Sequence, residues 1–226
     1  MMDQQLRLWP RTIREAHEIA ATHVARYKFA CDQLSGGTVC DVACGVGYGS
    51  NLLAGKVDKV VGVDIGDDAI DWANKHFKTD KISFFNCDIL AGWPVDESFD
   101  AVVSYETIEH LPEPEKFVSE IFDRLKPGGK LFMSLPNGPR DKARRDNPHH
   151  LQHFSDNEIT SLITRYFKNA KFYTLLYKHN LKHYINKWYR RLKLQRTGRD
   201  LVENYYLKPG LDTNAKMWFI TASKND

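Results

Sequence analysis

The sequence contains no long apolar run. None of its uninterrupted hydrophobic segments approaches the roughly 18 residues that a membrane-spanning helix requires. The first 20 residues, MMDQQLRLWPRTIREAHEIA, also lack the apolar stretch and the small-residue cleavage site of a signal peptide. These absences argue against membrane-embedded and secreted proteins, and they predict a cytoplasmic one.

Cysteine is scarce, and it is not spaced for a zinc site. The four cysteines contain no paired CxxC spacing: Cys31, Cys40, Cys44 and Cys87. Three of them lie in or beside predicted strands, where free thiols pack as small hydrophobic groups. We therefore expect all four to be reduced.

Acidic residues are missing from one long stretch. The whole chain carries a net charge of only +3, which is too small to argue for a nucleic-acid partner by itself. Between Lys171 and Arg199, however, there are nine Lys or Arg residues and no Asp or Glu. The positive charge is therefore concentrated in one segment of the C-terminal half.

Short β-rich runs alternate with helical patterns over most of the chain. Strands are predicted near residues 38–42, 59–64, 81–86, 100–104 and 130–134, and helices near 11–34, 48–55, 67–77 and 114–126. Such alternation requires crossover connections between parallel strands. The sequence therefore predicts an α/β, Rossmann-like fold with a mostly parallel sheet and helices on both faces.

The pattern changes after Asn137. Residues 137–154, NGPRDKARRDNPHHLQHF, are polar and rich in charge and histidine, which predicts a functional loop. A helix is expected from the N-cap Ser155, with Glu158 three residues later, to about Phe167. The runs KFYTLLY and AKMWFITAS predict two further strands.

The length predicts a single domain with an appendage. We expect it to span residues 1–226 and to be divided into four parts. These are an N-terminal helical cap (1–35), a ligand-binding core (36–136), a substrate loop (137–154) and a basic helical insertion before the last strand (178–210).

The stretch VCDVACGVGYG ends a predicted strand in a glycine-rich turn. Glycine lets a ligand approach the main chain closely, so such turns commonly bind nucleotide-like groups. The glycines at 45, 47 and 49 do not fit the G-x-G-x-x-G fingerprint of NAD-binding proteins, in which Ser50 would be the third glycine. Asp41 precedes the turn, and its charge suits a cationic ligand better than a pyrophosphate.

A carboxylate follows each of three successive predicted strands. Asp41 is the first, Asp64 ends the second strand where it can accept both hydroxyls of a ribose, and Asp88 follows the third near an adenine edge. Three carboxylates around a glycine turn without a phosphate-binding lysine suit an adenosine with a positive, phosphate-free tail. S-adenosylmethionine is such a ligand.

The sequence resembles the class I S-adenosylmethionine-dependent methyltransferases over roughly residues 20–170. The segments that carry the resemblance are DVACGVGYG, VVGVD, the acid in NCDIL, FDAVVSYETIEHL and LKPGGKLFMSLPN. HVARYKFA and NPHHLQHFS resemble a bacterial subgroup associated with surface-polysaccharide and related sugar pathways. The resemblance implies a seven-stranded sheet whose last strand is antiparallel.

The resemblance also implies the residues that bind the cofactor. Asp41, Gly45 and Gly47 would line its methionine portion, and Arg26 and Tyr27 would close over it, with Arg26 on its carboxylate. Asp64 would hold the ribose, and Asp88 with Ile89 would hold the adenine. Tyr105 and Glu106 would form the floor of the site between cofactor and acceptor. Ile65 would also contact the cofactor. The alternative for each acid is a helix N-cap or a turn residue.

Methyl transfer to a hydroxyl benefits from a general base, and histidine is the natural base near neutral pH. The candidate catalytic residues are His110, His149, His150 and Glu106, with His150 favoured because it aligns with the histidine of the subgroup's NP-aromatic-H pattern. The alternative for His110 is a structural histidine that orients the loop.

A divalent metal site is the alternative to this catalytic role. It would use His149, His150, His153 and Asp146 with Glu106 or Glu109. Adjacent histidines in an extended loop point in opposite directions, and no HExxH spacing is present. The sequence therefore predicts no metal.

The segment HNLKHYINKWYRRLKLQRTGR has the pattern of an amphipathic helix. Its apolar residues recur at helical spacing, and the other face is cationic. The simplest interpretation is a helix packed on the domain with a solvated basic face. The alternatives are a homodimer contact, a peripheral contact with an anionic membrane, or recognition of a phosphate on the acceptor.

The sequence thus predicts an S-adenosylmethionine-dependent methyltransferase. The expected acceptor is a hydroxyl, with an amine as the alternative, on a phosphorylated or nucleotide-linked sugar for surface polysaccharide or capsule synthesis. Other interpretations are RNA methylation, O-methylation of a quinone precursor, or a pseudoenzyme that only binds the cofactor. The motif SYETIE argues against nucleic acid, because adenine-amino methyltransferases carry an Asn/Asp-Pro-Pro-aromatic segment there.

Overall fold

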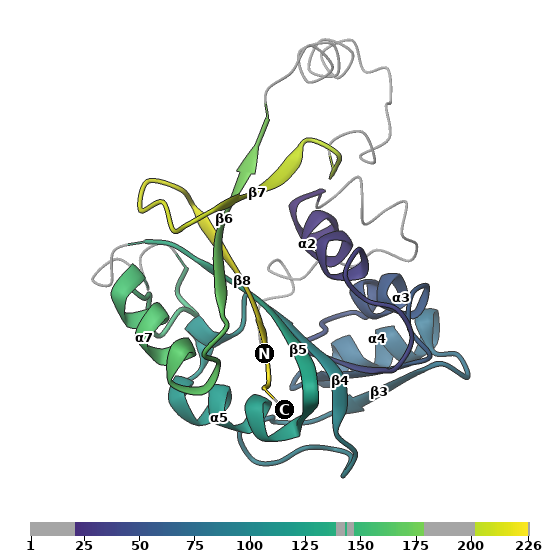
Figure 1. The fold of residues 1–226 in the computed structure, drawn as a ribbon. Coiled ribbons are helices and arrows are strands. Elements are labelled where there is room, and N and C mark those ends of the chain that lie inside the picture. Colours follow the sequence, from purple (N-terminus) through teal and green to yellow (C-terminus); the bar gives the residue numbers. More distant parts are fainter. Residues whose placement is uncertain (1–20, 139–142, 144–146, 179–201, 226) are drawn as a thin grey trace, which may run out of the picture.

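The computed structural model describes residues 21–138, 143, 147–178 and 202–225. Its centre is one sheet with the strand order β3-β2-β1-β4-β5-β8-β6-β7 (Figure 1). The strands are β1 (Thr38–Val42), β2 (Lys59–Asp64), β3 (Ile82–Asn86), β4 (Phe99–Tyr105), β5 (Leu125–Pro136), β6 (Lys171–Tyr177), β7 (Tyr205–Pro209) and β8 (Met217–Ser223).

Strands β1 to β5 are parallel, which confirms the predicted crossover topology. β8 pairs antiparallel with both β5 and β6, and β6 pairs antiparallel with β7. The expected antiparallel last strand is therefore present, but the sheet has eight strands where seven were expected. The additional strand is β7, which lies at the end of the interval 178–210 predicted as a helical insertion.

β7 was missed because its sequence carries little of a strand signal. It is a five-residue edge strand, YYLKP, whose residues are all half-buried or exposed. It also ends in proline, which is tolerated at a sheet edge but marks a turn in sequence. The rest of the predicted basic helix, from residue 179 to 201, lies outside the described residues.

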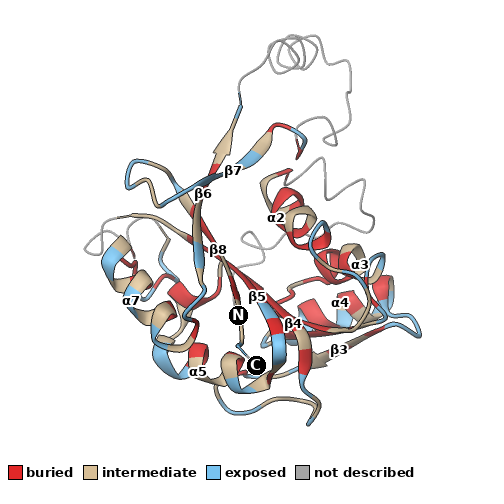
Figure 2. Ribbon diagram, in the orientation of Figure 1, coloured by how far each residue is buried: buried red, intermediate tan, exposed pale blue. Residues whose placement is uncertain are grey.

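Helices cover both faces of the sheet (Figure 1). They are α2 (Ala21–Cys31), α3 (Tyr48–Ala54), α4 (Asp67–Phe77), α5 (Pro114–Arg124) and α7 (Asp156–Tyr166), with a short 3-10 helix, η2, at Ile108–His110. One hydrophobic core lies between the sheet and α2, α3 and α4, and the other between the sheet and α5 and α7. The central strands are buried along their length (Figure 2), as apolar runs without alternation predict.

The predicted elements agree with the observed ones to within a few residues at most ends. The largest difference is β5, which begins at Leu125 although a strand was expected only from residue 130. Leu125 pairs with Phe99 and Lys130 with Ala101, so the Pro-Gly-Gly segment bulges out between two paired stretches of one strand. The predicted helix over residues 11–34 is described only as α2, because residues 1–20 lie outside the described part.

Two other predictions concern the thiols and membrane spans. All four cysteines carry free thiols. Cys40 and Cys44, in and after β1, are buried as expected, whereas Cys87 after β3 is half-buried and the buried Cys31 lies at the end of α2. Within the described ranges, no helix combines the length and apolar character needed to cross a bilayer.

Helix α7 begins with the predicted capping box. The Ser155 hydroxyl accepts a hydrogen bond from the Glu158 N–H at 3.3 Å, and the Glu158 carboxylate accepts one from the Ser155 N–H at 2.9 Å. These bonds satisfy two N–H groups that a helix start otherwise leaves without partners. They fix where the chain leaves the histidine-containing loop.

We expect Ser155→Ala to lower the free energy of unfolding by about 1 kcal/mol, because it removes the cap. Urea denaturation followed by circular dichroism measures this change. Ser161→Ala, at an exposed position of the same helix, is the matched control and should stay within about 0.5 kcal/mol of the wild type. Equal losses in the two variants would contradict the role of the cap.

Candidate active site

From β1 the chain crosses over to β2 on one side, and from β4 it crosses over to β5 on the other side. The strand order therefore reverses between β1 and β4. Ligands of open α/β sheets bind at such a switch point, outside the carboxyl ends of the strands. The only non-glycine residues with positive φ among those described follow these two ends: Ala43 (58°) after β1 and Glu106 (56°) after β4. Such backbone conformations are costly and cluster at functional sites.

The three glycines of the turn after β1 have different roles. A Cβ on Gly45, where φ is +56°, would meet nothing within 4 Å, so this backbone borders open space. A Cβ on Gly47 would lie 2.7 Å from the Phe84 ring, and one on Gly49 would lie 2.0 Å from the Tyr27 ring. Gly45 therefore leaves room for a ligand, whereas Gly47 and Gly49 permit close packing.

Asp41 lies under this turn and is held by two side chains. Its carboxylate accepts hydrogen bonds from the Tyr27 hydroxyl at 3.0 Å and from the Ser50 hydroxyl at 2.6 Å. Burial raises the Asp41 pKa from 3.8 to about 7, against the lowering by these two bonds, and the nearby Asp64 charge raises it further. The described contacts of Asp41 are thus with the protein interior, and its contact with the cofactor stays a prediction.

Asp64 ends β2 and is oriented by backbone N–H groups. It accepts hydrogen bonds from the Gly45 N–H at 2.8 Å and from the Gly66 N–H at 2.9 Å. These two bonds orient the carboxylate at the carboxyl end of β2. The next residue in the sequence, Ile65, is 62% exposed, so its apolar side chain contacts solvent. Both features fit a nucleoside.

Asp88 follows β3, two strands away from β1 in the sheet. It is exposed, and its Oδ1 accepts a hydrogen bond from the Leu90 N–H at 3.0 Å, which makes it a turn residue as the alternative interpretation supposed. Ile89 is buried in the second core. The predicted adenine contacts of Asp88 and Ile89 stay predictions.

Arg26 of α2 is completely buried at the end of β4. Its Nη1 lies 3.0 Å from a Glu106 carboxylate oxygen and donates to the Ser134 hydroxyl at 3.2 Å. Its Nε and Nη2 have no hydrogen-bond partner within the described structure. Tyr105 packs edge-on against Tyr27 and donates its hydroxyl hydrogen bond to the Arg26 carbonyl. Two unpaired donors of a buried guanidinium suit an anionic group of a ligand.

The histidine-rich loop pairs with the segment that follows β4. The Leu151 and Gln152 N–H groups donate to the Glu109 carbonyl at 2.9 and 3.3 Å. His110 Nδ1 lies 3.0 Å from the His149 carbonyl, within hydrogen-bond distance. The predicted loop thereby returns to the same rim of the sheet. Asp146, a candidate ligand in the sequence, lies outside the described residues.

Two imidazoles and one carboxylate converge on this rim. His150 is nearly buried, its ring centre is 4.8 Å from that of His110, and its Nδ1 lies 2.8 Å from His153 Nε2. Glu109 is completely buried, and burial together with the nearby Glu106 charge raises its pKa well above the ordinary value. His149 is exposed and contributes its carbonyl to the contact with His110.

The structure therefore brings the predicted residues into two neighbouring groups. Arg26, Tyr27, Asp41, Tyr105 and Glu106 surround the ends of β1 and β4. Of the candidate histidines, His110 lies in η2 after β4, and His149 and His150 lie on the loop after β5 that contacts it. Sequence reasoning gave no role to Ser50 and Ser134, and it considered His153 only as a metal ligand, not as the partner of His150. Ser50 could have been found as the hydroxyl that replaces a glycine in the turn, whereas nothing local marks Ser134 as a partner of Arg26.

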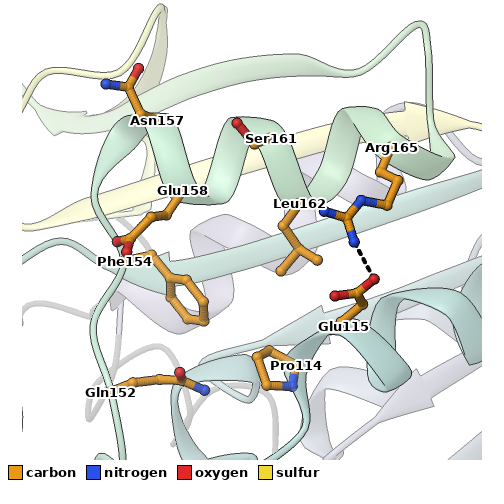
Figure 3. A pocket seen from close by; sticks show the side chains of 9 residues that line it. All are labelled: Pro114, Glu115, Gln152, Phe154, Asn157, Glu158, Ser161, Leu162 and Arg165. Carbon is orange, nitrogen blue, oxygen red and sulfur yellow. Dashed lines mark hydrogen bonds and ion pairs between the residues drawn. The ribbon is translucent and has the colours of Figure 1, made fainter.

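A separate cleft lies between α5 and α7 (Figure 3). It has a volume of about 400 Å³ and includes the ion pair of Arg165 with Glu115. Its lining residues are Pro114, Glu115, Gln152, Phe154, Asn157, Glu158, Ser161, Leu162 and Arg165, none of which was predicted to bind cofactor or acceptor. It is therefore distinct from the switch point.

Comparison with known proteins finds similarity to methyltransferases. Residues 40–133 match the family model of the methyltransferase domain. The chain is 33% identical over 145 residues to a probable S-adenosylmethionine-dependent methyltransferase of Mycolicibacterium smegmatis, covering 62% of this chain and 55% of the relative. It is 35% identical over 106 residues to the ubiquinone biosynthesis O-methyltransferase of Coxiella burnetii, covering 46% of this chain and 45% of the relative.

A solved structure extends the similarity over most of the fold. The N-methyltransferase NodS of Bradyrhizobium japonicum in complex with S-adenosyl-L-homocysteine matches with a TM-score of 0.59 and 15% identity, covering 95% of this chain and 89% of that one. Residues 40–133 thus match a methyltransferase domain, and the chain has the α/β, Rossmann-like fold of such proteins. The chain spans about half the length of the curated relatives that it matches.

We expect Asp41→Asn to change how stability depends on pH. Between pH values of about 4 and 7 the folded protein keeps a proton on Asp41 that the unfolded chain releases. This carboxyl therefore makes the free energy of unfolding fall as the pH rises through that window. Relative to the wild type, the variant should gain up to about 4 kcal/mol between about pH 4 and about pH 8.

Urea unfolding of both proteins across this range measures the difference. Other groups with shifted pKa values are present in both proteins, so their contributions to the difference largely cancel. Examples are Glu109, whose pKa is raised, and His23, whose pKa is lowered to about 3 by burial and by the Arg26 charge. A difference that is the same at every pH would contradict the assignment.

Proposed function

We propose that the protein transfers a methyl group from S-adenosylmethionine to a hydroxyl oxygen of a small sugar or sugar-phosphate precursor, with an amine as the alternative acceptor. The observation that carries the proposal is the placement of Glu109, His110 and His150 on the rim that also holds the glycine turn. A group that accepts a proton and a site for the methyl donor would then lie at one edge of the sheet. Surface-polysaccharide synthesis is the pathway that this acceptor suggests.

S-adenosylmethionine supplies, when bound, a methyl group on a sulfonium whose sulfur leaves as a neutral thioether, so alignment is the protein's main task. In the proposal, Asp64 accepts the ribose hydroxyls and Gly45 lets the ligand approach the main chain. The unpaired Arg26 donors would meet a carboxylate. Because Arg26 already contacts Glu106, the two residues would form one charged wall of the site.

The acceptor hydroxyl must lose its proton as its oxygen attacks the methyl carbon. His150 is the proposed proton acceptor, and His153 fixes its ring orientation through the 2.8 Å contact. His110 is held by the His149 carbonyl and would contact the acceptor from the exposed side. Tyr105 is packed under α2, so we assign it a supporting role beneath the cofactor.

The acceptor class is supported by two different observations. The segments HVARYKFA and NPHHLQHFS support a sugar, because they resemble the sugar-methyltransferase subgroup. The 35% identity to a ubiquinone biosynthesis O-methyltransferase supports a phenolic quinone precursor as the second candidate. Both are hydroxyl acceptors, so the same proton-accepting histidine serves either.

A panel of acceptors tests the proposal. The protein is incubated with S-adenosylmethionine and nucleotide sugars, phosphorylated sugars, catechol-type quinone precursors or short RNA, and release of S-adenosylhomocysteine is measured. We expect turnover with a sugar. Turnover only with a catechol would select the second candidate, and turnover only with RNA would contradict the acceptor class. Cofactor binding without turnover on any acceptor would favour a pseudoenzyme.

Asp64→Ala is expected to weaken binding of S-adenosylhomocysteine about tenfold or more, because a hydrogen-bonding carboxylate at the ribose is lost. Isothermal titration calorimetry measures the affinity. Asp71→Ala, which removes an exposed carboxylate of α4, is the matched control and should leave the affinity within about twofold. An unchanged affinity in Asp64→Ala would refute its role.

His150→Ala is expected to lower kcat by a factor of about 10² to 10⁴, since the proton acceptor is lost, while the affinity for S-adenosylhomocysteine stays nearly the same. Steady-state kinetics with the acceptor found in the panel, combined with calorimetry, separate the two effects. A large loss of cofactor affinity with little change in kcat would assign His150 to cofactor binding instead.

A further inference from the structure

The Glu109 carboxylate is held in an unusual environment. The residue is completely buried, and its backbone carbonyl accepts hydrogen bonds from two N–H groups of the histidine loop, those of Leu151 and Gln152. Yet neither carboxylate oxygen has a hydrogen-bond partner in the described structure. A buried carboxylate without a partner is costly, so native structures rarely leave one unless a ligand or an ion completes its environment.

Two imidazoles supply the groups that this carboxylate lacks. One ligand atom each from Glu109, His110 and His150 all lie within 4.8 Å of one another, and His110 Nε2 is 3.9 Å from Glu109 Oε1. Ligand atoms around a tetrahedral zinc ion are separated by about 3.4 Å, given metal–ligand distances of about 2.1 Å. Small side-chain rotations therefore suffice to bring the three atoms around one ion.

The outer contacts of both histidines match those of metal ligands. Histidines that bind metals usually donate their other ring N–H to a carbonyl or another acceptor, which fixes the ring and the tautomer. His110 has the His149 carbonyl 3.0 Å from Nδ1, so its Nε2 carries the lone pair on the side of Glu109. His150 has His153 Nε2 2.8 Å from Nδ1.

We propose that Glu109, His110 and His150 bind one divalent transition-metal ion. This set keeps His150 and Glu109 of the alternative metal site in the sequence and adds His110, whereas His149 is exposed and His153 contacts His150. Two imidazoles and a carboxylate suit Zn²⁺, Fe²⁺ or Co²⁺ better than Mg²⁺ or Ca²⁺, which favour oxygen ligands. His110 is about a third exposed, which gives the ion a path from solvent.

Three protein ligands leave a coordination position for another group, as in catalytic zinc sites. The ion's part in catalysis rests on the proposed methyl transfer. In the loaded protein His150 would be a metal ligand and would no longer accept the proton. The ion would supply a Lewis acid that lowers the pKa of the acceptor hydroxyl.

The test measures metal binding in the absence of cofactor and acceptor. The full chain is freed of metal with a chelator, dialysed, and titrated with Zn²⁺ by calorimetry and with Co²⁺ by visible absorption. We expect one equivalent to bind, with a cobalt spectrum typical of nitrogen and oxygen ligands, and much weaker binding of Mg²⁺. Absence of stoichiometric binding, or equal affinity for Mg²⁺, would overturn the proposal.

Variants locate the ion. Glu109→Gln and His150→Ala should each weaken Zn²⁺ binding by at least about a hundredfold, and His153→Ala by about tenfold to a hundredfold through the orientation of His150. His76→Ala is the control, since that histidine lies on α4 against Trp72. An effect of His76→Ala as large as that of His150→Ala would overturn the assignment.

Thermal unfolding supplies an independent reading. Glu109→Gln keeps the shape of the side chain and removes its buried charge, so it should fold. Zn²⁺ should raise the Tm of the wild type and leave that of Glu109→Gln unchanged. Equal shifts in the two proteins would place the ion elsewhere. No step of this test uses the methyl donor, so a failure to bind metal would leave the proposed methyl transfer standing. Metal binding without turnover on any acceptor would contradict the proposed methyl transfer but not the metal site.

Discussion

The site depends on a pair of neighbouring residues in α2 that reach two different strand ends. The buried Arg26 forms an ion pair with the partly exposed Glu106 after β4, and the Tyr27 hydroxyl donates to Asp41 at the end of β1. These contacts attach the helix to the two central strands at the point where the strand order reverses. Removing Glu106 would leave the charge of the fully buried Arg26 without its ion-pair partner, so the contact constrains the helix.

The same contacts shape the chemistry of the rim. The Tyr27 ring occupies the space beside Gly49, so the glycine turn can take its course only without a side chain there. Gly45 is then left bordering open space while its N–H is bonded to Asp64. On the other side, Glu106 is committed to Arg26, whereas the nearby Glu109 is left to the histidines. Two adjacent carboxylates thus have different roles because their neighbours differ.

Much of the fold could be predicted because its signals are local. The apolar runs of β1 and β2 and the amphipathic pattern of α4 gave their observed limits, and Ser155 with Glu158 gave the start of α7. β7 could not be found, because an exposed edge strand that ends in proline is stabilised by its pairing with β6 and not by its own composition. The bulge in β5 likewise depends on its pairing with Phe99.

The site was predictable as a set of positions but not as a set of contacts. Acids after successive strands indicate where a ligand binds, yet sequence spacing does not reveal that Asp41 is bonded to Tyr27 and Ser50. Nor does it show that the loop after β5 places His150 beside His110, because their side chains meet only through the folded backbone. The sequence could therefore suggest a metal site among these histidines, but only the structure brings Glu109, His110 and His150 together as one ligand set.

The central claim is that the switch point accommodates a sulfonium nucleoside and excludes a pyrophosphate. Calorimetric titration of the protein with S-adenosylmethionine and, separately, with NAD tests it most directly. The account predicts one equivalent of S-adenosylmethionine bound and no measurable heat with NAD. Tight binding of NAD with no binding of S-adenosylmethionine would contradict it.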